Sequence, residues 1–268
     1  MTMKKRNILL LAAVPFLLLA PGRASAGQKA VFTRRNYAHR GLHTKDQSIP
    51  ENSLRAFRLA VENGYGMELD VQLSKDGQVV VFHDDSLKRI CGVDKRVDEL
   101  SYEELKKLSL AGSIKDHIPL FSEVLDLVNG DTPLLVELKT GKRNNELCNK
   151  TYKLLQNYKG SYCIESFNPL IVSWFRFHAP EILRGQLATI PEKYVEQKPA
   201  LAFLLGNCLF NVLVRPQFIA YDIEKKPFPV RIAEMMGALK VCWTSHDPIN
   251  ETSNDAVIFE YYKPATKY

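Results

Sequence analysis

Nine short stretches of the chain carry the hydrophobic pattern of β-strands, and most are followed by a segment with helical spacing. The alternation is clearest at residues 67–73, where every second position is apolar and Glu68, Asp70 and Gln72 lie between. Because successive side chains of a strand point to opposite faces, both carboxylates are predicted to project from one face. The nine stretches are the residues around Tyr37 and residues 67–73, 79–82, 134–138, 162–166, 184–188, 218–221, 240–243 and 256–259.

Helix signals fall between these strands. Residues 54–62 have apolar side chains at helical spacing, with Asn52 or Ser53 as the N-cap and Asn63-Gly64 as the stop. Because capping residues and spacing agree, this helix is expected with these bounds. Further helices are expected at residues 101–108, 122–128, 145–158 and 169–178.

The rhythm of strand and helix predicts an α/β fold, a TIM-type (β/α)8 barrel formed by a single domain at residues 30–268. Eight of the nine strands would close the barrel, and the pattern does not identify which strand is the accessory one. The connection between the strands at 67–73 and 79–82 is predicted to be irregular. Only twelve residues separate Asp70 from His83, which is too few for a helical crossover between parallel strands.

The first 26 residues have the composition of a targeting segment. Three basic residues at positions 4–6 precede an apolar run at 8–20, and an Ala-x-Ala sequence ends at Ala26. The segment is either a signal peptide cut after Ala26 or an uncleaved membrane anchor, and both alternatives remain open. In either case the protein is expected to be exported or membrane-associated in the cell envelope, with its fold beginning near residue 30.

Charge and cysteine content argue against three classes of protein. The net charge is +6, but the first 26 residues hold four bases and no acid, so the rest carries 32 bases against 30 acids. Such a balance argues against nucleic acid as a partner, which would require a concentrated basic face. The five cysteines form no Cys-x-x-Cys pair, so they predict neither a disulfide framework nor a zinc site. They are expected to be buried free thiols.

Residues 200–214 are almost wholly apolar, with Gly206, Asn207 and Asn211 as the interruptions. One interpretation is a buried helix in the outer ring of the barrel. The other is a helix that rests on a membrane or guides a lipid-like substrate.

Chemically useful side chains follow several of the predicted strands. The carboxyl ends of barrel strands meet at one face, so Glu68, Asp70 and Glu137 are expected to converge there. Three carboxylates without sulfur select one hard divalent cation, Mg²⁺ or Ca²⁺, over zinc. For each pair taken alone, a solvated strand face is the simpler interpretation, but the simpler interpretation would have to hold independently at every strand end.

The remaining groups suit a phosphodiester. Arg40 and Lys139 can neutralise phosphoryl oxygens, and His39 and His83 can move protons near neutral pH. One imidazole would take a proton from the attacking oxygen and the other would give one to the leaving alkoxide. The sequence does not assign these two roles.

In order and spacing, a set of short motifs resembles the glycerophosphodiester phosphodiesterase family, within the phospholipase C-like phosphodiesterases. The resemblance runs from about residue 36 to the carboxyl terminus. It implies a TIM-type barrel, a divalent metal and hydrolysis of glycerophosphodiesters to an alcohol and sn-glycerol 3-phosphate. The motifs are Ala38-His39-Arg40-Gly41, Pro50-Glu51-Asn52-Ser53, Glu68-Leu69-Asp70-Val71, Lys75-Asp76-Gly77, His83-Asp84, Glu137-Leu138-Lys139 and Ser166-Phe167.

The resemblance also implies roles for individual residues. Glu68, Asp70 and Glu137 correspond to metal ligands, and His39 and His83 to the acid-base pair. Arg40 and Lys139 correspond to phosphate contacts, and Phe167 and Trp243 to apolar walls of the pocket. In the family, a glycerol hydroxyl of the substrate is thought to attack phosphorus. The chain departs from the family at 255–260, where a Gly-containing strand is usual, and at 200–214.

Two alternatives accompany the favoured enzyme. A lysophospholipase D-like hydrolase would act on membrane lysolipids, with membrane contact through residues 1–26 and 200–214. A non-catalytic phospholipid-headgroup binder would keep the barrel, but the complete set of histidines, carboxylates and Lys139 disfavours it.

Overall fold

The computed structural model describes residues 16–268, so most of the predicted targeting segment, residues 1–15, lies outside the described residues. Within 16–268, eight parallel strands close into a barrel in the order β1-β2-β6-β7-β8-β9-β10-β11, and β11 pairs back with β1. This confirms the predicted closed barrel. The strands are β1 (Arg35–Ala38), β2 (Gly66–Leu73), β6 (Leu134–Leu138), β7 (Tyr162–Ser166), β8 (Arg184–Ala188), β9 (Phe218–Asp222), β10 (Leu239–Ser245) and β11 (Ala256–Phe259).

The ninth predicted strand is the accessory one. It is β3 (Val79–Val81), which pairs antiparallel with the end of β2, so the two form a hairpin around Gly77. Gly77 has a φ of +77°, a conformation that favours glycine in the tight turn. The expected irregular connection is therefore a hairpin that leaves the barrel wall.

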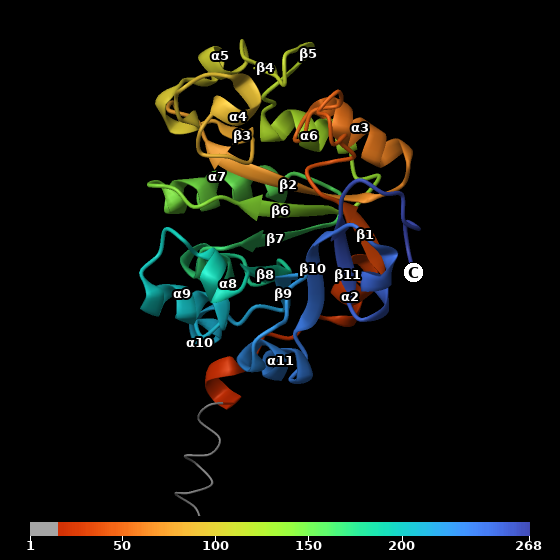
Figure 1. Cartoon of the computed structure of the whole chain (residues 1–268), viewed down its shortest axis with the longest axis vertical. Coiled ribbons are helices and arrows are strands. Elements are labelled where there is room, and N and C mark those ends of the chain that lie inside the picture. The colour runs from red at the N-terminus through yellow and green to blue at the C-terminus, as the bar shows by residue number, and fades with distance from the viewer. Residues whose placement is uncertain (1–15) are drawn as a thin grey trace, which may run out of the picture.

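A small subdomain follows β3 before the chain returns to the barrel. It packs around its own apolar cluster, which includes Val80, Leu87 and Leu110, and lies at the top of Figure 1. The helix predicted at residues 101–108 is only one turn long there, because the chain passes directly into a short antiparallel pair. The elements are α4 (Lys88–Cys91), η1 (Val97–Glu99), α5 (Tyr102–Leu105), β4 (Ser109–Leu110) and β5 (Ser113–His117).

Helices cover the outside of the barrel (Figure 1). The helix predicted at residues 54–62 is α3, with these same bounds, and the Ser53 hydroxyl accepts a hydrogen bond from the Ala56 amide at its start. Helix α8 begins as predicted at Pro169, after the Asn168 cap. The covering helices are α3 (Leu54–Glu62), α6 (Phe121–Val128), α7 (Asn144–Gln156), α8 (Pro169–His178) and α11 (Phe228–Met235), and short turns η2 (Pro191–Lys193) and η3 (Pro248–Thr252) follow β8 and β10.

Residues 200–214 do not form a single buried helix. They make two short helices, α9 (Pro199–Gly206) and α10 (Asn211–Val214), in the connection between β8 and β9. Ala202 and Val214 are buried, whereas Phe203 and Leu213 are 55% and 50% exposed. The outer-ring interpretation therefore accounts for only part of this segment. None of the helices in the described part of the chain has both the length and the apolar character needed to cross a membrane.

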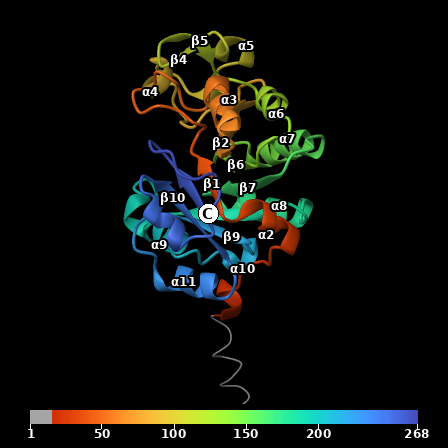
Figure 2. The ribbon, with the colours of Figure 1, turned by 90° about the vertical axis from the view of Figure 1, so that its right-hand side faces the viewer.

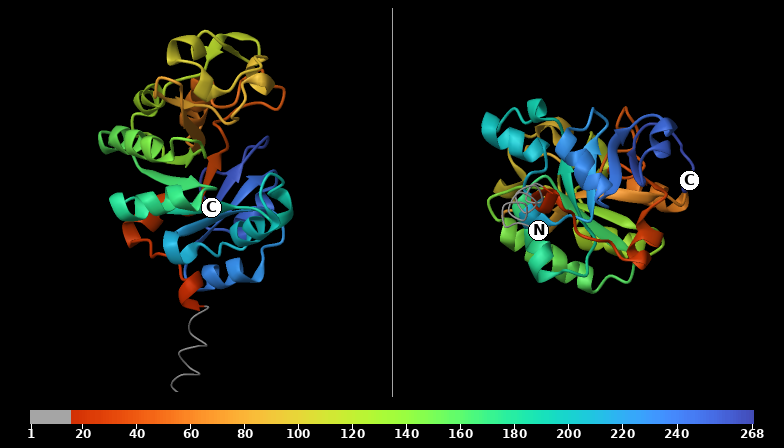
Figure 3. Two further views of the ribbon diagram at one scale, coloured as in Figure 1. Left: turned by 90° about the vertical axis from the view of Figure 1, so that its left-hand side faces the viewer. Right: turned by 90° about the horizontal axis from the view of Figure 1, so that it is seen from below.

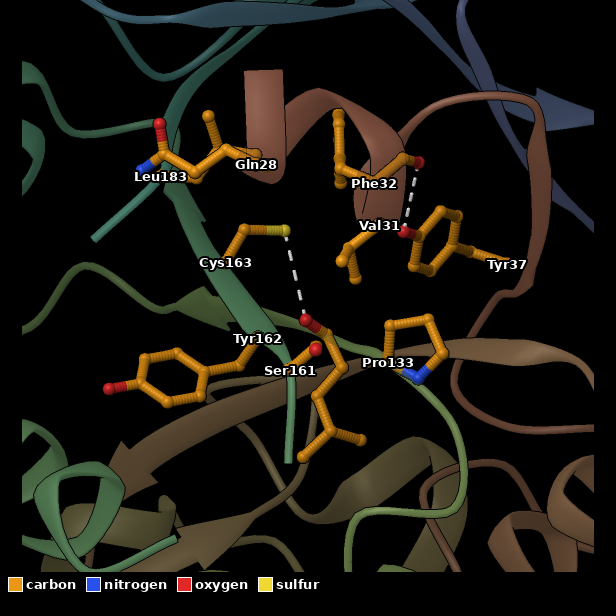
Figure 4. A pocket seen from close by; sticks show the side chains of 11 residues that line it. Gln28, Val31, Phe32, Tyr37, Pro133, Ser161, Tyr162, Cys163 and Leu183 are labelled. Atoms are coloured by element: carbon orange, nitrogen blue, oxygen red, sulfur yellow. Dashed lines mark hydrogen bonds between the residues drawn. The ribbon is translucent and has the colours of Figure 1, made fainter. Parts of the chain in front are cut away.

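Helix α2 (Ala26–Phe32) covers the end of the barrel at which the strands begin, the side that faces the viewer in Figure 2. Its Phe32 stacks at 4.8 Å from Phe218, and the Tyr37 hydroxyl donates a hydrogen bond to the Phe32 carbonyl. A small apolar pocket of about 220 Å³ remains beside Cys163 (Figure 4). Helix α2 therefore packs over this end of the barrel and leaves this small pocket beside it.

The chain just ahead of α2 is also packed. Arg215 donates to the Ala20 carbonyl at 2.7 Å, and the Gly22 amide donates to the Pro216 carbonyl at 2.9 Å. Ser25 caps α2. The packed structure thus extends ahead of residue 30.

Candidate active site

Three carboxylates meet at the carboxyl ends of two neighbouring strands. Glu68 and Asp70 project from β2, and Glu137 lies opposite Asp70 on β6. One oxygen from each lies within 4.8 Å of the others, and all three side chains are buried. The strand ends reach the face seen in the left panel of Figure 3. The prediction that these three carboxylates converge at the strand ends is therefore confirmed.

The cluster holds more negative charge than its two cations balance. Lys139 lies 3.2 Å from Asp70 and 2.9 Å from Glu137, and Arg40 lies 3.7 Å from Asp70. Burial, then repulsion from Asp70 and Glu137, raises the pKa of Glu68 well above its ordinary value. Burial alone would also raise the pKa of Asp70, but the charges of Lys139, His83 and Arg40 outweigh it and lower that pKa.

These features fit a divalent cation. The donor set is all oxygen, which suits Mg²⁺ or Ca²⁺. The buried Oδ1 of Asp70 has no hydrogen-bond partner of normal geometry among residues 16–268. A cation among the three carboxylates would relieve the repulsion that holds the pKa of Glu68 high. The cluster therefore has the donor chemistry and the geometry to hold a divalent cation.

His39 follows β1 and lies against the cluster. Its Nδ1 is 2.5 Å from Glu260 Oε1, and its Nε2 is 3.9 Å from Glu68 Oε2. Burial is the largest cause that lowers the pKa of His39 to about 4, although the hydrogen bond to Glu260 acts in the opposite direction. The imidazole is therefore neutral at pH 7. Because a carboxylate only accepts, Nδ1 carries the hydrogen and Nε2 presents a lone pair to the site.

His83 reaches the cluster from another element, the β2-β3 hairpin. Its Nδ1 is 2.6 Å from Asp84 Oδ1, and Arg89 donates to the other oxygen of Asp84 at 2.6 Å. His83 is near enough to the cluster that a proton on its ring would lower the pKa of both Asp70 and Glu137. The two predicted imidazoles thus both lie beside the carboxylates, each held through Nδ1 by its own carboxylate.

Arg40 is locked between the carboxylates. Its amide donates to Glu68 Oε2 at 2.9 Å, and its guanidinium donates to Glu51 at 2.6 Å. Gly41 follows with a φ of +78°, and a Cβ there would lie 2.9 Å from the Ala56 backbone. Only glycine fits this turn, so the glycine fixes where the histidine and arginine before it point.

Several site residues were missed from the sequence. Glu51 accepts from both Arg40 and Arg89, and these pairings outweigh burial and lower its pKa to about 2. Asn52 donates to Asp70 Oδ2 at 2.8 Å. From the sequence, the Pro50-Glu51-Asn52-Ser53 motif predicts a helix start and contributes to the family resemblance, but it assigns neither Glu51 nor Asn52 to the site. Glu260 belongs to the stretch that departs from the family, although a carboxylate directly after the last strand is itself a site signal.

A fourth buried carboxyl, Glu165 on β7, lies opposite Glu137 in the strand register. Burial, followed by repulsion from Glu137 and Asp70, raises its pKa well above the ordinary value. It stands outside the group of three whose oxygens lie within 4.8 Å of one another. Its raised pKa favours the neutral carboxyl, which adds no further charge to the cluster.

Phe167 and Trp243 lie farther round the mouth of the barrel. Their rings meet edge to face at 5.5 Å, and both line a cavity of about 780 Å³. Thr140, directly after Lys139, lines the same cavity. The predicted apolar walls therefore border the site without touching the carboxylate cluster.

The fold and this arrangement define a class, the (β/α)8-barrel proteins with a cluster of carboxylates and basic side chains at the carboxyl ends of the strands. A family model described as the glycerophosphoryl diester phosphodiesterase family matches residues 39–262. The chain belongs to this family. The family match confirms the resemblance that the sequence motifs indicated.

Curated relatives cover part of the chain. A glycerophosphodiester phosphodiesterase from Caldanaerobacter subterraneus subsp. tengcongensis is 36% identical over 56% of this chain and 65% of its own length. Lysophospholipase D GDPD1 of Rattus norvegicus is 35% identical over 54% of this chain and 48% of its own length. The chain therefore spans about half to two thirds of the length of these two relatives.

Solved structures share the fold. A glycerophosphodiester phosphodiesterase from Thermotoga maritima is 27% identical, with a TM-score of 0.63 over 84% of this chain and 93% of that one. An Oleispira antarctica phosphodiesterase, solved in complex with the product sn-glycerol-3-phosphate, is 24% identical with a TM-score of 0.71, over 87% of this chain and 95% of that one. The second likeness supports the barrel alone.

Proposed function

We propose that this protein is a metal-dependent hydrolase that cleaves glycerophosphodiesters to an alcohol and sn-glycerol 3-phosphate. The observation that carries the proposal is the buried group of Glu68, Asp70 and Glu137, flanked by two imidazoles and two cations in a chain of this family. Every group that the reaction needs is present within the barrel mouth. The cation is Mg²⁺ or Ca²⁺.

The metal would be held by Glu68, Asp70 and Glu137. When bound, it supplies Lewis-acid stabilisation of the charge that grows on the phosphoryl oxygens. Arg40 and Lys139 add fixed positive charge at the same place, since both already lie within 4 Å of Asp70. Their burial limits competition from water and strengthens this electrostatic contribution.

The two histidines take opposite proton-transfer roles. The neutral His39 accepts at Nε2 the proton of the attacking hydroxyl, which is a glycerol hydroxyl of the substrate in the proposed route. His83, hydrogen-bonded through Nδ1 to Asp84, gives a proton from Nε2 to the departing alkoxide. The new P–O bond thus forms as the old one breaks, and a water molecule then opens the cyclic phosphate with the roles reversed.

The direct test is release of sn-glycerol 3-phosphate from glycerophosphocholine and glycerophosphoethanolamine. We expect turnover that EDTA abolishes and that Mg²⁺ or Ca²⁺ restores, with the choice of ion read from the restored rate. Binding of the diester without its cleavage, by folded and metal-loaded protein, would overturn the proposal in favour of a headgroup binder.

The amino-terminal segment is proposed to place the protein in the cell envelope as a retained anchor. Its basic residues and apolar run support this location. Retention is favoured because cleavage after Ala26 would remove the Ser25 cap of α2 and the backbone contacts of Ala20 and Gly22.

Mass spectrometry of the amino-terminal peptide from envelope-purified protein tests this placement. We expect a peptide that begins ahead of Ala20. A mature terminus at Gly27 would show that the segment is a cleaved signal peptide. Recovery in the cytosolic fraction would contradict the envelope location itself.

A further inference from the structure

A chain of ion pairs connects the two sides of the candidate site. On one side, the Nδ1 of His83 lies 2.6 Å from Asp84. On the other, the Arg40 guanidinium donates to Glu51 at 2.6 Å. Arg89 donates to both oxygens of Asp84, at 2.6 and 3.0 Å, and to both oxygens of Glu51, at 2.7 and 2.9 Å. One guanidinium therefore joins the proposed proton donor to a proposed phosphate contact.

The shape of Arg89 suits this position. All three of its guanidinium nitrogens donate, and they lie in one plane with fixed directions. A lysine ammonium would supply the same charge, but its donors rotate and it cannot hold two carboxylates in set planes. Arg89 is 47% exposed, and an exposed ion pair contributes little to stability. The four contacts are therefore better suited to orienting the two carboxylates than to stabilising the fold.

Arg89 is carried by α4, in the small subdomain at the top of Figure 1. Its neighbour Ile90 is buried in the apolar cluster of the subdomain, and the Ala111 amide donates to the Ile90 carbonyl at 2.9 Å. These contacts anchor α4, so Arg89 reaches Asp84 and Glu51 from a fixed base. The subdomain thus takes part in the site although it lies outside the barrel wall.

The two carboxylates depend on Arg89 to different degrees. In the described part of the chain, the Asp84 carboxylate is hydrogen-bonded only to His83 and Arg89. Glu51 also accepts from Gln47 at 3.2 Å, and its own amide donates to the Gln47 side chain at 3.0 Å. Without Arg89, the Asp84 carboxylate would be held only by the ring that it orients, whereas Glu51 would keep a second support.

We propose that Arg89 is a positioning residue for the reaction. Through Asp84 it sets the direction of the His83 ring, and through Glu51 it sets, less strongly, the direction of Arg40. The inference rests on the proposed function, since it assigns a role at the same site. When the His83 ring can rotate, its Nε2 faces the departing alkoxide less often, so the step that needs a proton slows.

Two leaving groups separate the effect on His83 from the effect on Arg40. Choline departs as an alkoxide that needs a proton, whereas nitrophenolate is a stable anion that departs without one. Release of choline from glycerophosphocholine, and of nitrophenolate from the nitrophenyl ester of glycerol phosphate, is measured in a single turnover, so that only the first bond cleavage counts. We expect Arg89→Met to slow choline release about a hundredfold and nitrophenolate release about tenfold or less.

Arg96 provides a matched control. It lies in the same subdomain, is 44% exposed and also pairs with two carboxylates, those of Asp85 and Asp98. Arg96→Met removes the same charge from the same subdomain, and we expect it to change neither rate. Arg89→Lys keeps the charge but loses the planar fork, so its choline release should stay at least about tenfold slower than that of wild type.

A measurement without substrate separates this proposal from the proposed function. The ring nitrogens of His83 give NMR signals that are assigned by their loss in His83→Asn, and these signals report the hydrogen bond to Asp84. In protein with EDTA, we expect Arg89→Met to move the His83 signals and Arg96→Met to leave them in place.

The outcomes are distinct. Moved His83 signals in a protein whose wild type cleaves no diester would sink the proposed function and keep the hold of Arg89 on His83. An active wild type with unchanged choline release in Arg89→Met would overturn the positioning role alone. Equal slowing of both leaving groups would exclude the route through His83, and equal losses in Arg96→Met would assign the effect to the charge of the subdomain. Full recovery in Arg89→Lys would show that the planar fork is not needed.

Discussion

Loss of one cluster carboxylate is expected to abolish metal binding and to lower turnover about a thousandfold or more, in Glu68→Gln and in Asp70→Asn. Each change replaces one carboxyl group of the three whose oxygens lie within 4.8 Å of one another with an amide that cannot carry a negative charge. Isothermal titration with Mg²⁺ and Ca²⁺ measures the binding, and glycerol 3-phosphate release measures the rate. If Asp70→Asn bound metal with wild-type affinity, the metal would not be held by this cluster.

Asp116→Asn is the matched control. Asp116 on β5 is also a buried aspartate, but it pairs with Ser113 in the subdomain and with Arg55 on α3. The same carboxylate-to-amide change there should leave turnover and metal affinity near wild type. If both Asp70→Asn and Asp116→Asn lose stability but only Asp70→Asn loses metal binding, the loss of metal binding is not a result of lower stability.

Metal-free wild type and Glu68→Gln should differ in how their stability depends on pH, because only the wild type keeps the Glu68 carboxyl. Because the pKa of Glu68 is raised in the folded protein, while an unfolded glutamate titrates at about 4.3, the unfolded chain releases this proton first as pH rises. In EDTA the Glu68 contribution to stability is therefore present below about pH 4.3 and is lost as pH rises through the raised value. Glu68→Gln should be the more stable of the two above that range, and added metal should stabilise wild type but not Glu68→Gln.

Removal of the proposed base is the second large effect. His39→Asn is expected to lower kcat by about a hundred- to ten-thousandfold with KM little changed, because it removes the Nε2 lone pair beside Glu68. His178→Asn, at a histidine stacked on Trp174 outside the site, is the control and should remain active. Unchanged kcat in His39→Asn would assign the base elsewhere.

Glu260→Ala tests how His39 is held. Without the carboxylate, Nδ1 loses its acceptor and the hydrogen moves freely between the two ring nitrogens, so kcat should fall by about tenfold or more. The pH profile supplies a readout that simple misfolding does not give. In wild type, protonation of His39 removes the base only as pH falls toward about 4, the value to which burial lowers its pKa. An acid limb near neutral pH assigned to His39 would contradict this.

The strand pattern predicted most of the barrel because each strand exposes one face to the interior and one to the helices. The same pattern could not identify the accessory strand, since Val79–Val81 is as β-branched and as buried as the strands of the wall. Its place is decided by pairing with Val71 and its neighbours on β2, a long-range choice that composition does not record.

The sequence predicted those site residues that lie on a barrel strand or directly after one. Glu68, Asp70, Glu137 and His39 met this rule. Glu51 and Asn52 did not, because they precede a helix and turn back toward the cluster through a positive φ at Asn52. Residues 200–214 could be recognised as unusual from their composition, but their division into two helices depends on tertiary contacts such as Tyr221 with Gly206.

The hairpin of β2 and β3 has a mechanical consequence. The amide of Phe82 donates to the Asp70 carbonyl at 3.0 Å, and the Gln72 side chain donates to the carbonyls of both Phe82 and Asp84. His83 is therefore clamped to the strand that supplies Asp70, whereas His39 is carried by β1. A displacement of β1 relative to β2 would therefore change the distance between His39 and Asp70, whereas His83 and Asp70 would move together.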